Sequence, residues 1–425
     1  MDFKGKKLLI LGANPETAGL VIKAREMGVN TVVTDYDPNA YAKRYASKSY
    51  NIDAVDVKSL YRMAMEEEIN GVLVGVAESL LSTYEKLCKI LDLPCYGSEQ
   101  LFNIMADKAK FKTACRKYNV PVVTEYNLAN NPTEEEIASI PLPVVIKPVD
   151  NCSSKGISVC CTIEDLKNGI KKALVYSKRK KFIIEKYMTG DEVVIYYIIQ
   201  DSEPFLVGMC DRYTNKEQAG VAQLPTAYIF PSRYLDKYIA GMDNTVKFML
   251  RNIGMKNGPL FIQSFIENGE VRFYEPGFRL NGAQEHYIVN AISGLDAKEL
   301  MIHYALTGRM SDEKLALKAN PNYGGWGCKL SPLVMTGQIN TLKGLGEIAK
   351  IPEVISINPS YDEKDTVIDI GTLKQIICRF FIIAKTKERL AEVIDIIHSK
   401  LIVLDTGGQN MMLTPFDTKI IIEKY

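Results

Sequence analysis

Two lysines in the middle of the chain stand where short apolar segments end. Lys147 follows the apolar residues 144–146, and Lys108 follows Asp107 at the start of a helix-like stretch. A lysine that ends a buried strand leaves the sheet at its rim, where its ammonium can meet an anion instead of water. Taken singly, Lys108 also fits a solvated surface and Lys147 an edge-strand position. Their order along the chain favours an anion site.

A small polar loop follows Lys147. It covers residues 149–159 and contains Ser153, Ser154 and Gly156. Successive backbone N–H groups in such a loop can point at phosphate oxygens. The loop matches neither of the two common glycine-rich phosphate motifs, and an ordinary hairpin loop is the alternative interpretation.

A third segment has the pattern of a hinge between two strands. An apolar run at 182–184 leads into Glu185, Lys186, Tyr187 and Met188, and a second strand begins near Glu192. An adenine can lie against such a crossing and read its backbone N–H and C=O groups. Glu192 would then reach the ribose hydroxyls.

The fourth segment combines a carboxylate with a guanidinium. Glu275 leaves a predicted hairpin strand, and Arg279 comes four residues later. A carboxylate there can bind a hard cation, and the arginine can neutralise a phosphoryl group in transfer. A surface salt bridge between the two is the alternative.

These residues need elements to position them. Up to about residue 95, short apolar runs alternate with helical patterns, as at 8–11, 31–34 and 71–75, which predicts a parallel sheet covered by helices on both faces. A ligand crevice is expected at the carboxyl ends of its strands, near Asn14, Asp35 and Glu78.

The rest of the chain no longer alternates short strands with helices in a regular order. Helices are predicted at 98–106, 107–118, 164–180, 231–252 and 386–401. Strands predicted at 260–267 and 271–275 are joined by Asn268-Gly269, a strong hairpin signal. Residues 320–325 resemble a linker, and the segment from 325 to 425 reads as a small α+β domain.

Composition excludes several classes of function. The 425 residues carry 52 Lys and Arg against 51 Asp and Glu, so no net field favours nucleic acid or a membrane surface. No run of 18 apolar residues spans a membrane. Nine Cys without a CxxC pair, and three His, argue against a disulfide framework and a zinc site. A cytoplasmic setting is expected.

The order of these segments resembles the ATP-grasp superfamily, especially biotin carboxylase, carbamoyl-phosphate synthetase and L-amino-acid ligase members. The resemblance implies mixed α/β and α+β architecture: a pre-grasp α/β domain at 1–97, an ATP-grasp domain at 98–320 and a C-terminal α+β domain at 325–425. It also implies ATP and Mg²⁺ or Mn²⁺ as cofactors, small-molecule carboxylate and amine substrates, and a homodimer.

The resemblance assigns a role to each candidate residue. Lys147 and Arg279 would be catalytic, and Glu275 with Gln263 would hold the metal. The substrate would meet Asn14, Glu78, Arg212, Arg279 and Asn281. The nucleotide would meet Lys108, Lys147, Ser153, Ser154, Gly156, Glu185, Lys186, Tyr187, Met188 and Glu192.

The implied activity is that of a carboxylate–amine or carboxylate–thiol ligase working through an acyl phosphate, on an amino acid or amino-sugar-like molecule. A bicarbonate-using carboxylase is an alternative. Two departures from the family pattern motivate a third reading, a nucleotide-binding protein with little turnover. Gln263 replaces the first metal carboxylate, and Gly277 replaces an asparagine between Glu275 and Arg279.

Overall fold

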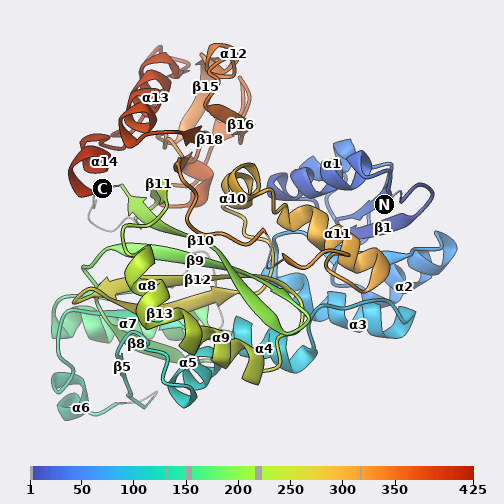
Figure 1. Cartoon of the computed structure of the whole chain (residues 1–425). Coiled ribbons are helices and arrows are strands. Elements are labelled where there is room, and N and C mark those ends of the chain that lie inside the picture. Colours follow the sequence, from blue (N-terminus) through green and yellow to red (C-terminus); the bar gives the residue numbers. More distant parts are fainter. Residues whose placement is uncertain (1–2, 130–131, 150–155, 216–222, 316–317) are drawn as a thin grey trace.

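The computed structural model describes residues 3–129, 132–149, 156–215, 223–315 and 318–425 (Figure 1). In these ranges, no helix has both the length and the apolar character needed to cross a bilayer. Ser153 and Ser154, which the sequence assigns to the predicted phosphate loop, lie outside them.

The N-terminal part is a parallel sheet with the strand order β3-β2-β1-β4. Strand β1 lies between β2 and β4, and its residues 8–11 are fully buried, as expected for a strand covered on both faces. The strands are β1 (Lys7–Leu11), β2 (Asn30–Thr34), β3 (Lys48–Tyr50) and β4 (Gly71–Val74), and the helices are α1 (Ala18–Glu26), α2 (Val57–Glu66) and α3 (Leu81–Leu91). Strand β3 was not among the predicted elements, because its three residues are too few to show a pattern.

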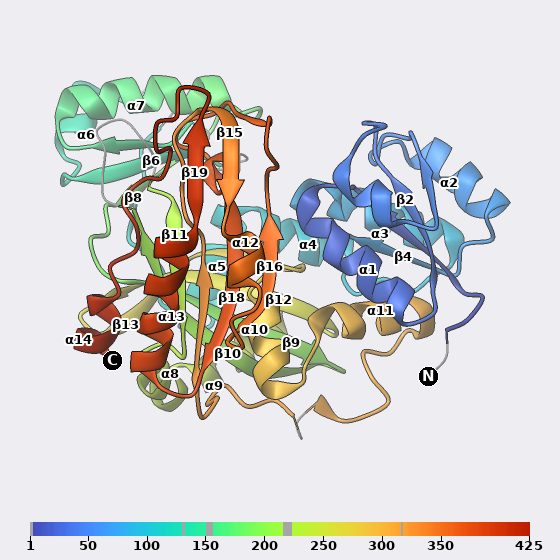
Figure 2. The same ribbon diagram turned by 90° about the horizontal axis from the view of Figure 1, so that it is seen from above.

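Two helices lead from this sheet to a small antiparallel one with the order β5-β8-β6-β7. Asp107 caps the second helix by accepting hydrogen bonds from the N–H groups of Ala109 and Lys110. The elements are α4 (Glu99–Ala106), α5 (Lys108–Lys117), β5 (Glu125–Tyr126), α6 (Glu134–Ala138), β6 (Val144–Pro148), β7 (Ser158–Cys160), α7 (Ile163–Tyr176) and β8 (Phe182–Lys186). In Figure 2 this small sheet and α7 lie on the far side of the molecule from the N-terminal sheet.

A long antiparallel sheet forms the centre, with the order β13-β12-β9-β10-β11-β14-β18-β16. It runs without a break from the middle of the chain into the predicted C-terminal domain. Its strands are β9 (Glu192–Gln200), β10 (Glu203–Thr214), β11 (Pro225–Phe230), β12 (Gly258–Glu267), β13 (Glu270–Gly277), β14 (Trp326–Leu330), β16 (Val354–Pro359) and β18 (Cys378–Ala384). The predicted hairpin is confirmed: Asn268 and Gly269 have φ of 52° and 74°, as a type I′ turn requires.

The helices of this part are α8 (Leu235–Gly241), α9 (Asp243–Asn252), α10 (His286–Ser293) and α11 (Ala297–Thr307). The single helix predicted over 231–252 is therefore wrong. The helix is interrupted at Met242, directly after Gly241, a residue with low helix propensity. Helix α11 returns to the N-terminal sheet, where a Cβ at Gly71 of β4 would lie 2.5 Å from the carbonyl oxygen of Ala305.

A further small sheet, β17-β15-β19, completes the C-terminal part. Its elements are β15 (Gly337–Lys343), α12 (Leu345–Ile348), β17 (Thr366–Val367), α13 (Lys387–Lys400), β19 (Ile402–Asp405) and α14 (Lys419–Lys424). Helix α13 begins after Thr386, whose hydroxyl accepts a hydrogen bond from the N–H of Arg389, so the helix predicted over 386–401 is confirmed.

Candidate active site

A buried glutamate lies between two lysines at the junction of the small sheet and α5. Glu185 on β8 is 2% exposed, and Lys147 on the neighbouring β6 donates to its Oε2 at 2.6 Å. Lys112, fully buried on α5, pairs with the other carboxylate oxygen. Burial alone would raise the pKa of Glu185, but the two ammonium groups outweigh it and lower the pKa to about 2. The site therefore holds Glu185 as an anion between two ammonium groups, and Lys112 also pairs with Glu125 at 3.0 Å.

We expect Glu185→Gln to lower the free energy of unfolding by about 3 kcal/mol at pH 7, because it removes the buried carboxylate that pairs with both Lys112 and Lys147. Since the folded-state pKa lies below the ordinary value, the charge of Glu185 stabilises the protein above about pH 4.5. That contribution disappears as the pH falls toward 2.

Urea unfolding at pH 7 and pH 3 measures this difference. The gap between wild type and variant should be smaller at pH 3. Glu267→Gln is the control, since Glu267 pairs with the exposed Lys186 and with Arg272 and should contribute less than about 1 kcal/mol. An equal loss at both pH values would contradict the assignment.

The two predicted metal ligands face each other across one hairpin. Gln263 on β12 is paired with Glu275 on β13. Lys108, 9% exposed at the start of α5, lies 3.4 Å from Glu275 Oε1. Burial would lower the pKa of Lys108, but Glu275, with Glu78 and Glu185 further away, raises it. The ammonium of Lys108 thus lies among the carboxylates of Glu275, Glu78 and Glu185.

The donor set fits a divalent cation that arrives with a polyphosphate. Glu275 and Gln263 supply a carboxylate and an amide oxygen, and Mg²⁺ is commonly held by one or two carboxylates plus substrate phosphates. In the part of the chain that the structure describes, no group of three His, Cys, Asp or Glu side chains could hold a metal by itself. Two further oxygen-bearing side chains have protein partners: Glu267 pairs with Lys186, and the Oδ1 of Asn281 accepts from the N–H of Ala283.

Arg279 lies at the end of the same hairpin. Its guanidinium stacks at 5.2 Å on the ring of Phe261, and its Nη2 lies 3.6 Å from Glu78 Oε2 at the rim of the N-terminal sheet. A Cβ at Gly277 would lie 2.0 Å from that ring. The glycine that departs from the family pattern therefore makes room for Phe261, which supports Arg279. The Nε of Arg279 is buried, and none of the described residues accepts a hydrogen bond from it.

Glu192 lies in a second charged group beside these residues. It pairs with Arg212 on β10, and the hydroxyl of Tyr274 donates to its Oε2 at 3.4 Å. Tyr274 also donates to Gln263 at 2.8 Å, and the ammonium of Lys147 lies 5.3 Å from the Tyr274 ring. Tyr274 thus connects the predicted metal, phosphate and ribose ligands, although the sequence did not single it out.

Two backbone N–H groups of the hinge after β8 have partners within the protein. The N–H groups of Lys186 and Tyr187 already donate to the carbonyls of Thr124 and Pro143, at 2.9 and 3.1 Å. Gly156 has φ of 81°, and a Cβ on it would lie 2.7 Å from Pro148 and Tyr176, so this end of the predicted phosphate loop requires glycine.

Asn14 has a local structural task. Its Oδ1 accepts from the hydroxyl of Thr17 at 2.5 Å and caps the short 3-10 helix Pro15–Thr17. Its side chain is thus engaged at the rim of the N-terminal sheet.

Sequence reasoning missed a buried group behind Arg212. Lys329 on β14 is 1% exposed, and its ammonium lies 4.1 Å from the ring of Tyr228. Burial lowers its pKa to about 7; Glu285 opposes this shift, and the charges of Arg379 and Arg212 add to it. Glu285 is fully buried, and within the described residues no donor lies in good hydrogen-bond geometry to its carboxylate oxygens, although Tyr196, Lys329 and Arg379 all act on its pKa. A buried carboxylate with free acceptors is suited to hold a polar ligand.

Residues 140–281 match the ATP-grasp domain family. The formate-dependent phosphoribosylglycinamide formyltransferase of Bacillus velezensis is 31% identical over 174 residues, which cover 39% of this chain and 44% of that protein. The Sulfurisphaera tokodaii protein of the same name is 28% identical over 213 residues, 47% of this chain and 52% of that one. The chain thus spans about half the length of these curated relatives.

Solved structures resemble nearly the whole chain. The L-amino acid ligase from Bacillus licheniformis superposes with a TM-score of 0.78 at 15% identity, over 95% of this chain and 99% of that one. The biotin carboxylase domain of Hydrogenobacter thermophilus 2-oxoglutarate carboxylase, solved with MgADP and bicarbonate, gives 0.76 at 16% identity, over 99% and 94%. At these identities the likeness establishes the fold.

Proposed function

Because residues 140–281 form an ATP-grasp domain in a chain with the ATP-grasp fold, we propose that this protein is an ATP-dependent ligase that joins a carboxylate to an amine through an acyl phosphate. The observation that carries the proposal is the row of charges formed by Lys147, Lys108, Glu275 and Arg279. This row has the charges that phosphoryl transfer needs and includes no nucleophilic side chain.

Each residue has a task in this reaction. Lys147 and Lys108 hold phosphate oxygens, Glu192 holds the ribose, and Glu275 with Gln263 holds a divalent cation, which when bound neutralises phosphate charge. A substrate carboxylate oxygen attacks the terminal phosphorus, and the bond to the bridging oxygen breaks to release ADP. Arg279 neutralises the transferred group. The amine then attacks the acyl carbon and inorganic phosphate leaves.

The amine must lose a proton in the second step, and Lys329 is suited to accept it. With its pKa near 7, a large fraction of Lys329 is neutral at physiological pH. Since only the neutral form accepts a proton, kcat/KM should rise with pH through about 7 and then level off. Lys329→Arg should lose this inflection, because arginine stays protonated.

A pH–rate profile of both proteins measures this prediction. Lys298→Arg is a matched control: Lys298 is also buried, and its ammonium lies 3.9 Å from the ring of Tyr287, but it belongs to α11 against the N-terminal sheet. An inflection near pH 7 that survives in Lys329→Arg would rule out this role for Lys329.

Release of phosphate from ATP, measured with pools of amino acids and amino sugars, tests the ligase proposal. We expect release that depends on both a carboxylate and an amine. An ATP-dependent rise in melting temperature without release from any pair would contradict it, and would favour the nucleotide-binding reading that Gln263 suggests.

A second candidate uses bicarbonate as the carboxylate. The buried Glu285 favours it, because a free carboxylate beside Lys329 could orient and deprotonate a small acid. Phosphate release that requires bicarbonate, and no amino acid, would distinguish this reaction from the first.

A further inference from the structure

The last helix of the chain contacts the central sheet directly behind the predicted ribose ligand. Asp211 on β10 is 1% exposed. Its Oδ2 accepts a hydrogen bond of 2.5 Å from the hydroxyl of Tyr425, and its Oδ1 accepts one of 2.5 Å from Ser232. Tyr213 in turn donates to the Tyr425 hydroxyl at 3.3 Å. Tyr425 is thus one of two hydroxyl donors to a buried carboxylate.

Strand geometry connects this carboxylate to the nucleotide side of the sheet. Successive side chains of a strand point to opposite faces, so Arg212 points away from Asp211 and toward Glu192. Arg212 and Glu192 are also opposite each other in the β10–β9 ladder. A shift of β10 at Asp211 therefore moves the guanidinium that holds Glu192.

The residue before Glu192 belongs to the same rear network. The carboxylate of Asp191 pairs with Arg233 and accepts from the hydroxyl of Tyr234 at 2.6 Å. Lys424, the residue before Tyr425, lies 3.9 Å from the same carboxylate. Both strands that present the Glu192–Arg212 pair are therefore held from behind by the region around α14.

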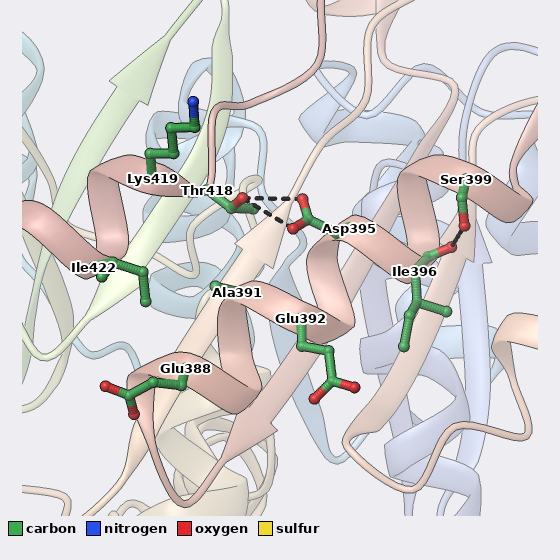
Figure 3. Close-up of a pocket in the computed structure, with 9 residues that line it drawn as sticks. All are labelled: Glu388, Ala391, Glu392, Asp395, Ile396, Ser399, Thr418, Lys419 and Ile422. Carbon is green, nitrogen blue, oxygen red and sulfur yellow. Dashed lines mark hydrogen bonds between the residues drawn. The ribbon is translucent and has the colours of Figure 1, made fainter.

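Helix α14 is itself fastened to the C-terminal part. Thr418, at its start, donates to both carboxylate oxygens of Asp395 on α13, at 3.0 and 3.1 Å, as Figure 3 shows. The ring of Tyr425 lies 5.4 Å from Trp326 in an edge arrangement. These contacts connect α13, through α14, to β10.

We propose that Tyr425 is a positioning residue: by holding Asp211 it fixes Arg212 and Glu192 in the geometry that binds the ribose of the nucleotide. This inference rests on the proposed function, in which Glu192 binds the ribose hydroxyls. It gives the C-terminal part of the chain a role in nucleotide affinity.

The test compares three ligands by calorimetry: ATP, 2′-deoxy-ATP and inorganic tripolyphosphate. In Tyr425→Phe, which keeps the ring and removes the hydroxyl, the Kd for ATP should rise about fivefold. The preference for ATP over 2′-deoxy-ATP should shrink, and the Kd for tripolyphosphate should stay unchanged. A purely structural role would weaken all three ligands together.

Two further variants sharpen the test. Thr418→Ala, which loosens α14 from α13, should shift the ATP preference in the same direction by a smaller factor. Tyr361→Phe is the control, because the Tyr361 hydroxyl donates to the carbonyl of Lys374 within the C-terminal part, at 2.7 Å. It should leave all three affinities unchanged.

An unchanged preference for ATP over 2′-deoxy-ATP in Tyr425→Phe would overturn the inference, as would an equal loss of affinity for tripolyphosphate. The failure of the proposed function looks different. In that case wild type itself would not bind ATP, or would bind ATP and 2′-deoxy-ATP equally well.

Discussion

Lys147→Ala is expected to remove almost all of the stabilisation that ATP confers on the protein. Lys147 contacts Glu185 and lies over Tyr274, at the centre of the predicted nucleotide contacts. We expect a loss of about 100-fold in ATP affinity, or about 2.7 kcal/mol. At an ATP concentration of 100 times the wild-type Kd, wild type gains about 2.7 kcal/mol from binding and the variant only about 0.4 kcal/mol.

The ATP-dependent shift in melting temperature is the measurement, because the variant also starts from a lower stability. The variant removes one partner of the buried Glu185, and this lowers the stability of the protein both with and without ATP. Lys167→Ala is the control, since Lys167 on α7 pairs with the exposed Glu134. A shift as large as that of wild type would show that Lys147 does not hold the phosphates.

Arg279→Lys is expected to lower kcat by a factor of about 100 to 1,000 and to leave the KM for ATP within about threefold. Arginine presents a planar fork that two phosphate oxygens can share, and lysine offers a single point charge. The Phe261 ring fixes the guanidinium plane, and its stacking would be weakened by lysine.

Steady-state kinetics separate the two parameters. Arg272→Lys is the matched control, because Arg272 lies on β13, the strand that leads to Arg279, and pairs with Glu267 and Glu270 at the turn end of the hairpin. A parallel loss of ATP affinity in Arg279→Lys would place Arg279 among the nucleotide-holding residues and contradict a role in phosphoryl transfer.

Much of the fold follows from local patterns. Strands β1 and β4 of the N-terminal sheet contain continuous apolar runs, and the β12–β13 turn contains the Asn268-Gly269 pair that selects its geometry. The strand order of the central sheet, in contrast, could not be predicted from local patterns. The pairing of β11 with β14 joins residues about 100 positions apart, and nothing in either strand encodes its neighbour.

The site residues also fall into two groups, those that local sequence order predicts and those that depend on distant contacts. Lys147, Glu185 and Glu192 belong to neighbouring segments, so their order alone was informative. Lys112 was missed, although it lies one helical turn after Lys108 and on the same face of α5. Lys112 can be buried because it pairs with Glu185, 73 residues later, and a pairing at that separation leaves no local pattern in the sequence.

Lys329 illustrates the limit more sharply. A single lysine in a five-residue strand has no local signal that separates a surface charge from a buried one. Only the assembled structure buries this ammonium near Arg379 and Arg212, which lowers its pKa, while the carboxylate of Glu285 opposes the shift.

The central sheet also limits how this chain can be divided. Strand β14 hydrogen-bonds to β11 on one side and to β18 on the other, so the sheet is continuous past the linker at residues 320–325. Removal of everything beyond the linker would leave β11 with an unpaired edge that invites association with other chains. The segment after residue 325 is therefore not an exchangeable module. A chimera that replaced it would need a strand able to complete the same ladder.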